Sequence, residues 1–156
     1  MLNWRPVTLA AVMIDLHAHT TASDGSLRPA QLVRLAARIG LAAVGVTDHD
    51  TVAGCAEAVA AAAGAVIEVV PGIEISVDYP HGEFHLLGYF VDYQHAPFRE
   101  RLEYLQDNRV NRNQRMVEKM QAYGLPITME DVVAEAGGGQ VGRPHMAKAL
   151  VKQGVV

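Results

Sequence analysis

The chain has 156 residues, 50% of them hydrophobic, which suffices for one domain with a core but hardly for two independent domains. Its net charge of -4 and pI of about 5.9 exclude nucleic-acid binding through a general positive field, whereas a local phosphate-binding pocket stays open. The single cysteine, Cys55, excludes an intrachain disulfide framework and a thiolate zinc cluster, and it favours a reducing, cytoplasmic setting.

Residues 1–12 precede the first motif and form a short, mostly apolar extension. The extension has one arginine but no convincing cleavage region, which makes it a poor signal peptide. Nowhere does the sequence approach the roughly 18 uninterrupted apolar residues that span a bilayer. We therefore expect a soluble protein with no membrane partner.

Strands and helices are predicted to alternate from residue 12 onward. VMIDL at 12–16 predicts a buried strand, and a polar loop follows it through Gly25. Apolar residues then recur at helical spacing, from a start near Pro29 to a stop at Gly40. The first unit is therefore a strand, a loop and a helix.

The same order repeats further along the chain. A strand is predicted at 41–46, then the loop TDHDT and an Ala-rich helix from about 52 to 64, and apolar segments follow at 65–70 and 83–90. This alternation predicts an α/β architecture with parallel strands. In such folds the loops after the carboxyl ends of the strands carry the chemistry.

The character changes to helical after about residue 95. A long charged stretch predicts a solvated helix that ends at Gly124, and Thr128 with Asp131 predicts the start of a short second helix. Glycines at 137–139 break that helix, and GRPHMAKALVKQG predicts a third. We expect a small helical module over residues 95–156.

His17 and His19 stand two residues apart at the end of the first predicted strand. In extended backbone both imidazoles point to the same side and can chelate one ion, and Asp24 adds a carboxylate from the following loop. This mixture of donors suits zinc, manganese or iron better than calcium. The alternative is that these are surface loop residues without a common role.

The loop TDHDT places Asp48, His49 and Asp50 after the second strand, in a position equivalent to that of the first histidines. Loops at equivalent positions of adjacent parallel strands converge in space. The alternative is a helix cap, in which Asp50 or Thr51 accepts backbone N–H bonds. Capping would not prevent His49 from binding a metal.

Glu74 lies in the otherwise apolar segment VPGIEIS, where an unpaired carboxylate is costly to bury. It needs an arginine, a hydrogen-bond network or a metal ion as its partner. His85 lies between Phe84 and Leu86 in a predicted strand, where a lone histidine is commonly a core residue. Because histidine clusters accompany both residues, we favour metal binding for Glu74 and His85.

The remaining candidates have weaker support. His81 and His95 lie in polar turns, where we expect them to face solvent, and Cys55 is expected to pack within its helix. His145 follows Arg143 in GRPH near a predicted helix N-terminus, an arrangement that holds phosphate through guanidinium, imidazole and backbone N–H groups. A cap-region arginine with a surface role is the alternative.

The segments DLHAHTTASDG, TDHDT, PGIEIS and EFHLLGYF, followed by GRPH, together resemble the polymerase and histidinol phosphatase (PHP) family, and within it the TrpH-like phosphoesterases. The resemblance implies the N-terminal portion of a distorted (β/α)7 barrel, with residues 13–94 as a partial barrel and residues 95–156 as a truncated helical insertion. It also implies two or three divalent metal ions, either manganese, iron or zinc.

Carried over to this chain, the resemblance implies that clustered ions activate a water molecule and polarise the phosphoryl group, so that no protein nucleophile is needed. The implied metal ligands are His17 and His19 at one ion, Asp24 and His49 at a second, Glu74 as a bridge and His85 at a third ion, and the implied phosphate contacts are Arg143 and His145.

Members of the family continue beyond the point equivalent to Val156 with further strands, an Asp-x-His pair and another histidine. We therefore expect missing ligands, an unclosed barrel edge and exposed apolar surface that favours self-association. The expected substrate is a small phosphorylated nucleotide, either a 3′,5′-bisphosphorylated nucleoside or the 5′ end of a short RNA or DNA. The alternatives are a histidinol-phosphate phosphatase and a catalytically incomplete metal-binding module.

Overall fold

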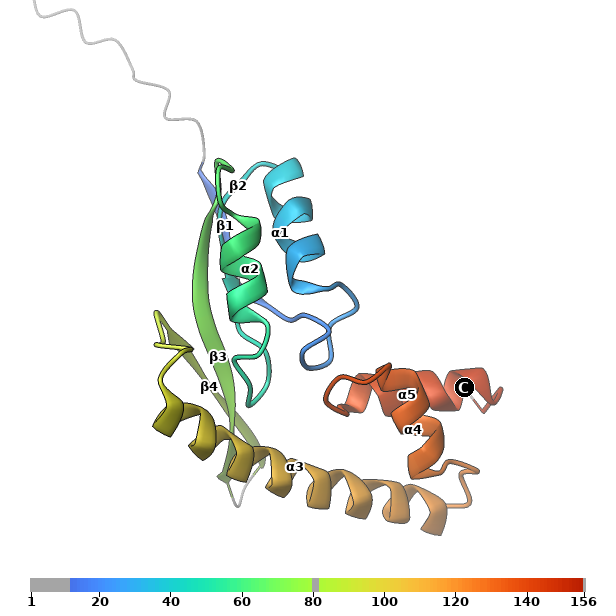
Figure 1. The fold of residues 1–156 in the computed structure, drawn as a ribbon. Coiled ribbons are helices and arrows are strands. Elements are labelled where there is room, and N and C mark those ends of the chain that lie inside the picture. Colours follow the sequence, from blue (N-terminus) through green and yellow to red (C-terminus); the bar gives the residue numbers. More distant parts are fainter. Residues whose placement is uncertain (1–11, 80–81, 156) are drawn as a thin grey trace, which may run out of the picture.

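The computed structural model describes residues 12–79 and 82–155. These residues form a four-stranded sheet, two helices packed on the sheet and a group of three further helices (Figure 1). His81 and nearly all of the N-terminal extension lie outside the described residues. The elements are β1 (Met13–Ala18), α1 (Pro29–Arg38), β2 (Leu41–Val46), α2 (Cys55–Ala61), β3 (Glu68–Tyr79), β4 (Gly82–Tyr89), α3 (Ala96–Ala122), α4 (Met129–Ala136) and α5 (Arg143–Lys152).

The strands lie in the order β1-β2-β3-β4. The pairs β1–β2 and β2–β3 are parallel, as the alternating pattern predicts, because a helix connects each pair. The expectation of parallel strands is wrong for β4, which pairs antiparallel with β3 from Gly72↔Tyr89 to Tyr79↔Gly82. The physical reason is the short connection, since the few residues between β3 and β4 leave no room for a crossover helix.

Helices α1 and α2 cover one face of the sheet (Figure 1). Val33 and Ala36 of α1 pack with Val44 and Val46 of β2 and with Ala58 of α2, all of them almost fully buried. The polar residues of α1, Gln31, Arg34 and Arg38, are exposed, which is the amphipathic pattern expected of a helix on a sheet. This core fixes the ends of β1 and β2, from which the candidate site residues project.

Helix α2 is shorter than the range of about 52 to 64 that the sequence predicts. It begins at Cys55, after the N-cap Gly54, and ends at Ala61. The residues before it are held away from the helix, because Thr51 Oγ1 accepts a hydrogen bond from Ala53 N and Val52 packs in a core with Ile73. Cys55 is buried, as expected.

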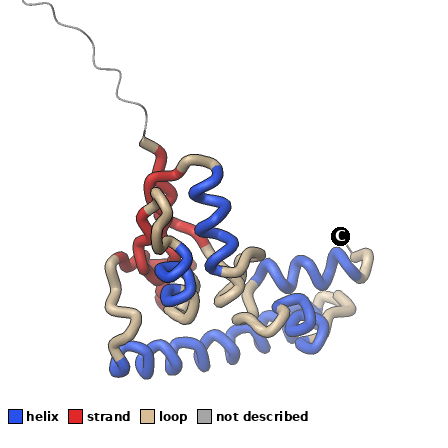
Figure 2. Tube along the Cα trace, turned by 45° about the horizontal axis from the view of Figure 1, so that its top comes forward, coloured by secondary structure: helices blue, strands red, loops and turns tan. Residues whose placement is uncertain are grey.

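Helix α3 is a long, uninterrupted helix that runs past one end of the sheet (Figure 2). Helices α4 and α5 pack at its C-terminal half around a separate core that contains Val117, Ile127 and Val132. The predicted capping box of α4 is present, because Asp131 N donates to Thr128 Oγ1 and Thr128 N donates to Asp131 Oδ2. Within the described residues, none of the helices has the length and apolar character needed to cross a bilayer.

The outer strands expose apolar side chains. Met13 and Ile14 of β1 are 55% and 56% exposed, so the prediction of a buried first strand is wrong, because β1 lies at the edge of the sheet. Phe84 and Leu86 of β4 are 50% and 53% exposed. Phe84 and Leu86 alternate with His85, so the apolar pair points to the face of β4 opposite the histidine. The exposed apolar surface expected from the sequence is therefore confirmed at both edges of the sheet.

Candidate metal centre

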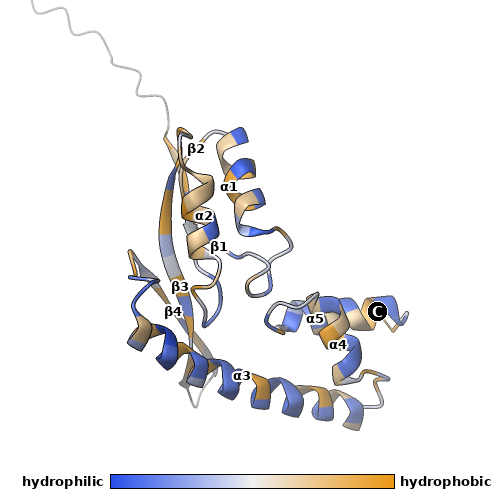
Figure 3. Cartoon of the chain, viewed as in Figure 1, coloured by the Kyte–Doolittle hydropathy of each residue, from blue (hydrophilic) through white to orange (hydrophobic). Residues whose placement is uncertain are grey.

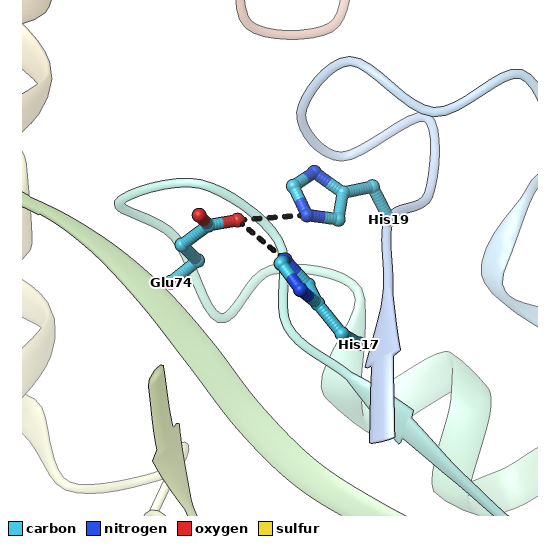
Figure 4. Close-up of side chains that lie close together, drawn as sticks. All are labelled: His17, His19 and Glu74. Atoms are coloured by element: carbon cyan, nitrogen blue, oxygen red, sulfur yellow. Dashed lines mark hydrogen bonds and ion pairs between the residues drawn. The ribbon is translucent and has the colours of Figure 1, made fainter. Parts of the chain in front are cut away.

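Glu74 of β3 lies at the centre of a group of imidazoles. Its Oε2 atom lies 2.9 Å from His17 Nε2 and 2.8 Å from His19 Nε2, and its Oε1 atom lies 2.7 Å from His85 Nδ1. Figure 4 shows His17, in β1, and His19, the residue after β1, reaching the same carboxylate oxygen. The buried Glu74 carboxylate therefore has the partners that its position in an apolar strand requires, and they are histidines.

Asp24 and His49 extend the cluster on the other side of His19. His19 Nδ1 lies 2.8 Å from Asp24 Oδ1, and His49 Nε2 lies 3.7 Å from Asp24 Oδ2. His49 Nδ1 in turn lies 3.6 Å from Glu74 Oε2. The side chains form three groups in which the potential ligand atoms lie within 4.8 Å of one another. These groups are His17, His19 and Glu74; His19, Asp24 and His49; and His49, Glu74 and His85.

The electrostatics of the cluster keep its carboxylates ionised and one of its histidines neutral. Burial opposes ionisation of Asp24, but the hydrogen bond with His19 and the charges of His49 and Arg109 outweigh it and lower its pKa to about 2. Burial and the nearby Arg109 lower the pKa of His49 to about 4. A neutral His49 keeps a nitrogen lone pair available for a metal ion.

Asp48 shapes the loop that carries the first ligands. Its Oδ1 atom accepts hydrogen bonds from Thr20 N and Ser23 Oγ, and its Oδ2 atom accepts one from Thr20 Oγ1, all at 2.7 Å. Asp48, Thr20 and Ser23 are almost fully buried. This network holds the loop between His19 and Asp24 in one conformation, so that both residues face His49.

Asp50 joins three parts of the structure. Its carboxylate accepts hydrogen bonds of 2.8 Å from Ser76 N and Ser76 Oγ on β3, and its Oδ2 atom lies 3.6 Å from Arg109 Nη1 on α3. The helix-cap interpretation of Asp50 is therefore wrong, since its side chain binds the neighbouring strand and α2 begins only at Cys55. Thr51 binds the backbone of Ala53, within the loop rather than at the helix start.

The segment between α4 and α5 contacts the loop of the candidate metal ligands. A Cβ atom at Gly139 would collide with the carbonyl oxygen of Thr21, and one at Gly142 would lie 2.9 Å from Asp24 Oδ2. Asn113 of α3 supports this segment by donating a 2.8 Å hydrogen bond to the carbonyl oxygen of Val141. Glycine is thus needed at 139 for close approach to a backbone carbonyl, beyond the helix-breaking role that the sequence predicts, and a side chain at 142 would displace Asp24.

The close contact places the start of α5 beside the cluster. His145 is buried, and its Nδ1 atom accepts a 3.0 Å hydrogen bond from Gly142 N, which leaves Nε2 as its protonated nitrogen when the ring is neutral. Burial and Lys148 lower the pKa of His145. Arg143 is exposed at the first residue of α5, and His95 is exposed before α3, as expected.

All six residues predicted as metal ligands thus meet at one place, whereas the sequence pattern does not indicate several of the residues that support them. Arg109 is 6% exposed and Asn113 is 2% exposed, although both lie in a stretch that predicts a solvated helix. Nothing in the spacing of the charges of α3 singles them out. Asp48 and Asp50 are adjacent to His49, but their partners, Thr20 and Ser76, lie far away in the sequence.

The donor set fits a cluster of divalent metal ions. Four imidazoles and two carboxylates are the mixture that zinc, manganese and iron accept. His49 Nδ1 is buried without a hydrogen bond, which is costly unless another partner satisfies it. A metal ion between His49 and Glu74 would provide that partner and would neutralise the carboxylate.

Comparison with known proteins finds relatives named for activity on RNA and on nucleotides. The chain is 37% identical over 146 residues to the 5′-3′ exoribonuclease Rnm of Escherichia coli and 32% identical over 144 residues to the 3′,5′-nucleoside bisphosphate phosphatase of Chromobacterium violaceum. Each alignment covers 92% of this chain and 50% of the relative, so the chain spans about half the length of these relatives.

A solved structure from Bifidobacterium adolescentis, named as a candidate metal-dependent phosphoesterase, superposes with a TM-score of 0.82 at 35% identity. The superposition covers 94% of this chain and 52% of that one. The family model of the PHP domain matches residues 15–130, a range that includes all six residues of the cluster. This chain therefore belongs to the PHP domain family, whose relatives named here are phosphoesterases.

Proposed function

We propose that this chain contributes the metal centre of a phosphoesterase that hydrolyses phosphate monoesters of a small nucleotide, either a 3′,5′-bisphosphorylated nucleoside or the 5′ end of a short oligonucleotide. The observation that carries the proposal is the convergence of His17, His19, Asp24, His49, Glu74 and His85 into three overlapping groups. The relatives named for nucleotide and RNA substrates support the substrate class.

The proposed ligands divide among the ions by their contacts. His17 and His19 would bind one ion, Asp24 and His49 a second, and His85 a third, with Glu74 as the bridge because its two oxygens face different histidines. Two or three manganese, iron or zinc ions would be held. Such ions supply Lewis-acid polarisation of a phosphoryl oxygen and activation of water as the nucleophile.

Arg143 and His145 are the proposed phosphate contacts. Both belong to the first turn of α5, where backbone N–H groups favour an anion. His145 donates from Nε2, because its Nδ1 atom is occupied by Gly142 N. The tight contact between Gly142 and Asp24 fixes the distance between these donors and the metal ligands.

We also propose that β1 to β4 are the first part of the distorted (β/α)7 barrel and that residues 95–156 are its helical insertion. The curved sheet with helices on one face, and the separate core of α4 and α5, support this division. Residues 13–94 would then carry the metal ligands, and residues 95–156 would carry the phosphate contacts.

The test is hydrolysis measured with manganese on a 3′,5′-bisphosphorylated nucleoside, a 5′-phosphorylated oligoribonucleotide and histidinol phosphate. We expect release of phosphate from the first two, lost in His17→Ala and retained in His95→Ala, a matched control with an exposed histidine. Turnover of histidinol phosphate alone would instead assign that substrate. Bound metal without turnover on any of the three would assign a metal-binding module.

A further inference from the structure

A groove separates α3 from the candidate metal centre and the β3–β4 hairpin. It encloses a cavity of about 880 Å³. One wall includes Asp50 and His85 of the site, and the other consists of α3 residues at helical spacing. We call this cavity the α3 groove, and the α3 residues on which the inference depends are Tyr104, Arg109, Arg112 and Arg115.

The α3 groove is basic in a chain that is acidic overall. Among the described residues that line it are three arginines and one acidic residue, Asp50, while the whole chain has a net charge of -4. Asp50 is already paired with Arg109 at 3.6 Å. Arg112 and Arg115 form no ion pair within the described part of the chain. The groove thus concentrates positive charge where an anionic ligand can reach it.

Two of these arginines also carry hydrogen-bond donors without partners. The Nε atoms of Arg109 and Arg112 are buried and have no hydrogen bond, and the Arg109 side chain is only 6% exposed. Buried donors of this kind are costly unless a ligand or water satisfies them. A phosphate oxygen is the natural acceptor for a guanidinium.

The shape of the groove suits a chain of phosphates rather than a single one. Arg109, Arg112 and Arg115 follow at intervals of three residues, so they cover about 9 Å of the helix axis on neighbouring positions of α3. Tyr104, 62% exposed, lies two turns before Arg112 on the same face. Figure 3 shows that most of this helix is hydrophilic along its length.

We propose that the α3 groove binds the sugar-phosphate backbone of a single-stranded oligonucleotide whose terminal phosphate lies at the metal centre. Arg112 and Arg115 contact phosphates beyond the first nucleotide, and Tyr104 stacks on a base. Basic grooves with exposed aromatic side chains bind single strands in this way. The proposal rests on the proposed function and selects, of its two substrate classes, the oligonucleotide.

The test is fluorescence anisotropy with the full chain and 3′-labelled oligoribonucleotides of five nucleotides and of one nucleotide, in EDTA to prevent hydrolysis. The variant is Arg112→Gln/Arg115→Gln, and the matched control is Arg38→Gln/Arg101→Gln, which removes the same charge from exposed positions outside the groove. Circular dichroism and thermal unfolding verify that both variants fold.

We expect the five-nucleotide probe to bind the wild-type chain at least about tenfold more tightly than the mononucleotide, and the groove variant to lose about tenfold in affinity for the longer probe alone. For the groove variant, the plot of the logarithm of the association constant against the logarithm of the salt concentration becomes shallower by about 1.4, as expected for two lost phosphate contacts. The control variant stays within about twofold of wild type, because neither of its two arginines lines the groove.

Three results would overturn the proposal: equal affinity for both probes, equal losses in the two variants, or equal competition by polyglutamate and unlabelled oligonucleotide, which would assign the groove to acidic peptides. Because the assay needs neither metal nor turnover, each of these results is separate from a failure of the proposed hydrolysis. Manganese binding, measured in parallel, reports on the metal centre alone.

Discussion

Arg109 of α3 and Asp50 beside His49 form a buried ion pair, with 3.6 Å between Nη1 and Oδ2 and side chains that are 6% and 1% exposed. Gln106 adds a second link, since its Nε2 atom donates a 2.9 Å hydrogen bond to the carbonyl oxygen of Asp50. These contacts join the long helix to the loop that carries His49. The helix is therefore part of the support of the candidate metal centre.

Arg109→Met should destabilise the chain by about 3 kcal/mol, because it leaves the Asp50 carboxylate buried without its cation. Urea denaturation measures this change in the free energy of unfolding. Arg101→Met, on an exposed position of the same helix, is the control and should change the free energy by less than about 0.5 kcal/mol. In Asp50→Asn/Arg109→Met both charges are absent, so a loss as large as that of the single variant would contradict the ion-pair explanation.

Much of the site follows from the sequence because its ligands lie in short, local patterns. His17 and His19 share a strand end, and His49 follows the next parallel strand, so their convergence follows from the geometry of a parallel sheet. Glu74 and His85 are conspicuous as polar residues in apolar strands. Each signal needs only a few adjacent residues.

The supporting contacts could not be predicted, since they join residues distant in the sequence. The pairs Asp50–Arg109 and Asn113–Val141 depend on how α3 packs, and nothing in a run of charged residues specifies which arginine is buried. The antiparallel direction of β4 depends on a short turn rather than on the composition of the strand. Tertiary packing therefore determines these side-chain partners and this strand direction, which the local sequence pattern does not specify.

The approach of Gly139 to Thr21 gives a prediction about glycine. Gly139→Ala should destabilise the chain by about 1–3 kcal/mol, because the added methyl collides with a backbone carbonyl that cannot move freely. Gly124→Ala is the comparison, since its φ of +81° is strained but its Cβ would meet open space, and it should cost about 1 kcal/mol. Urea denaturation of both variants measures the difference. A smaller cost for Gly139→Ala than for Gly124→Ala would show that the two loops do not pack closely.

The buried Cys55 thiol should react slowly with thiol reagents and lose its proton only at high pH. Burial raises its pKa from 9.0 to about 11, so at pH 8 the native thiolate fraction is about 100-fold below that of the unfolded chain. Reaction with Ellman's reagent should accordingly be at least about 100-fold slower in the native state than in urea. Equal rates would show that the thiol is accessible.

The same raised pKa makes stability depend on alkaline pH. The native state holds the Cys55 proton more tightly, so its contribution of about 3 kcal/mol is present below pH 9 and is lost as pH rises toward about 11. The free energy of unfolding of wild type should therefore fall more steeply over this window than that of Cys55→Ala, as measured by urea denaturation at each pH. Parallel curves would refute a buried, protonated thiol.

The exposed edges of the sheet predict self-association. Light scattering after size exclusion should give a mass that rises above 16.8 kDa as concentration increases, since Phe84 and Leu86 offer apolar surface on an edge strand. Phe84→Lys/Leu86→Lys should reduce this association. Val66→Lys, at a 99% exposed position before β3, should not. A constant mass of one chain at all concentrations would contradict the prediction.

The central claim is that six side chains form one metal centre with Glu74 at its middle, and the metal content of the purified chain tests it most directly. After loading with manganese and removal of excess metal, elemental analysis should find two or more ions per wild-type chain and less than half of that content in Glu74→Gln. Glu68→Gln, an exposed glutamate of the same strand, should keep the wild-type content. Wild-type chain without bound metal, or a Glu74→Gln variant that binds as much as wild type, would contradict the account.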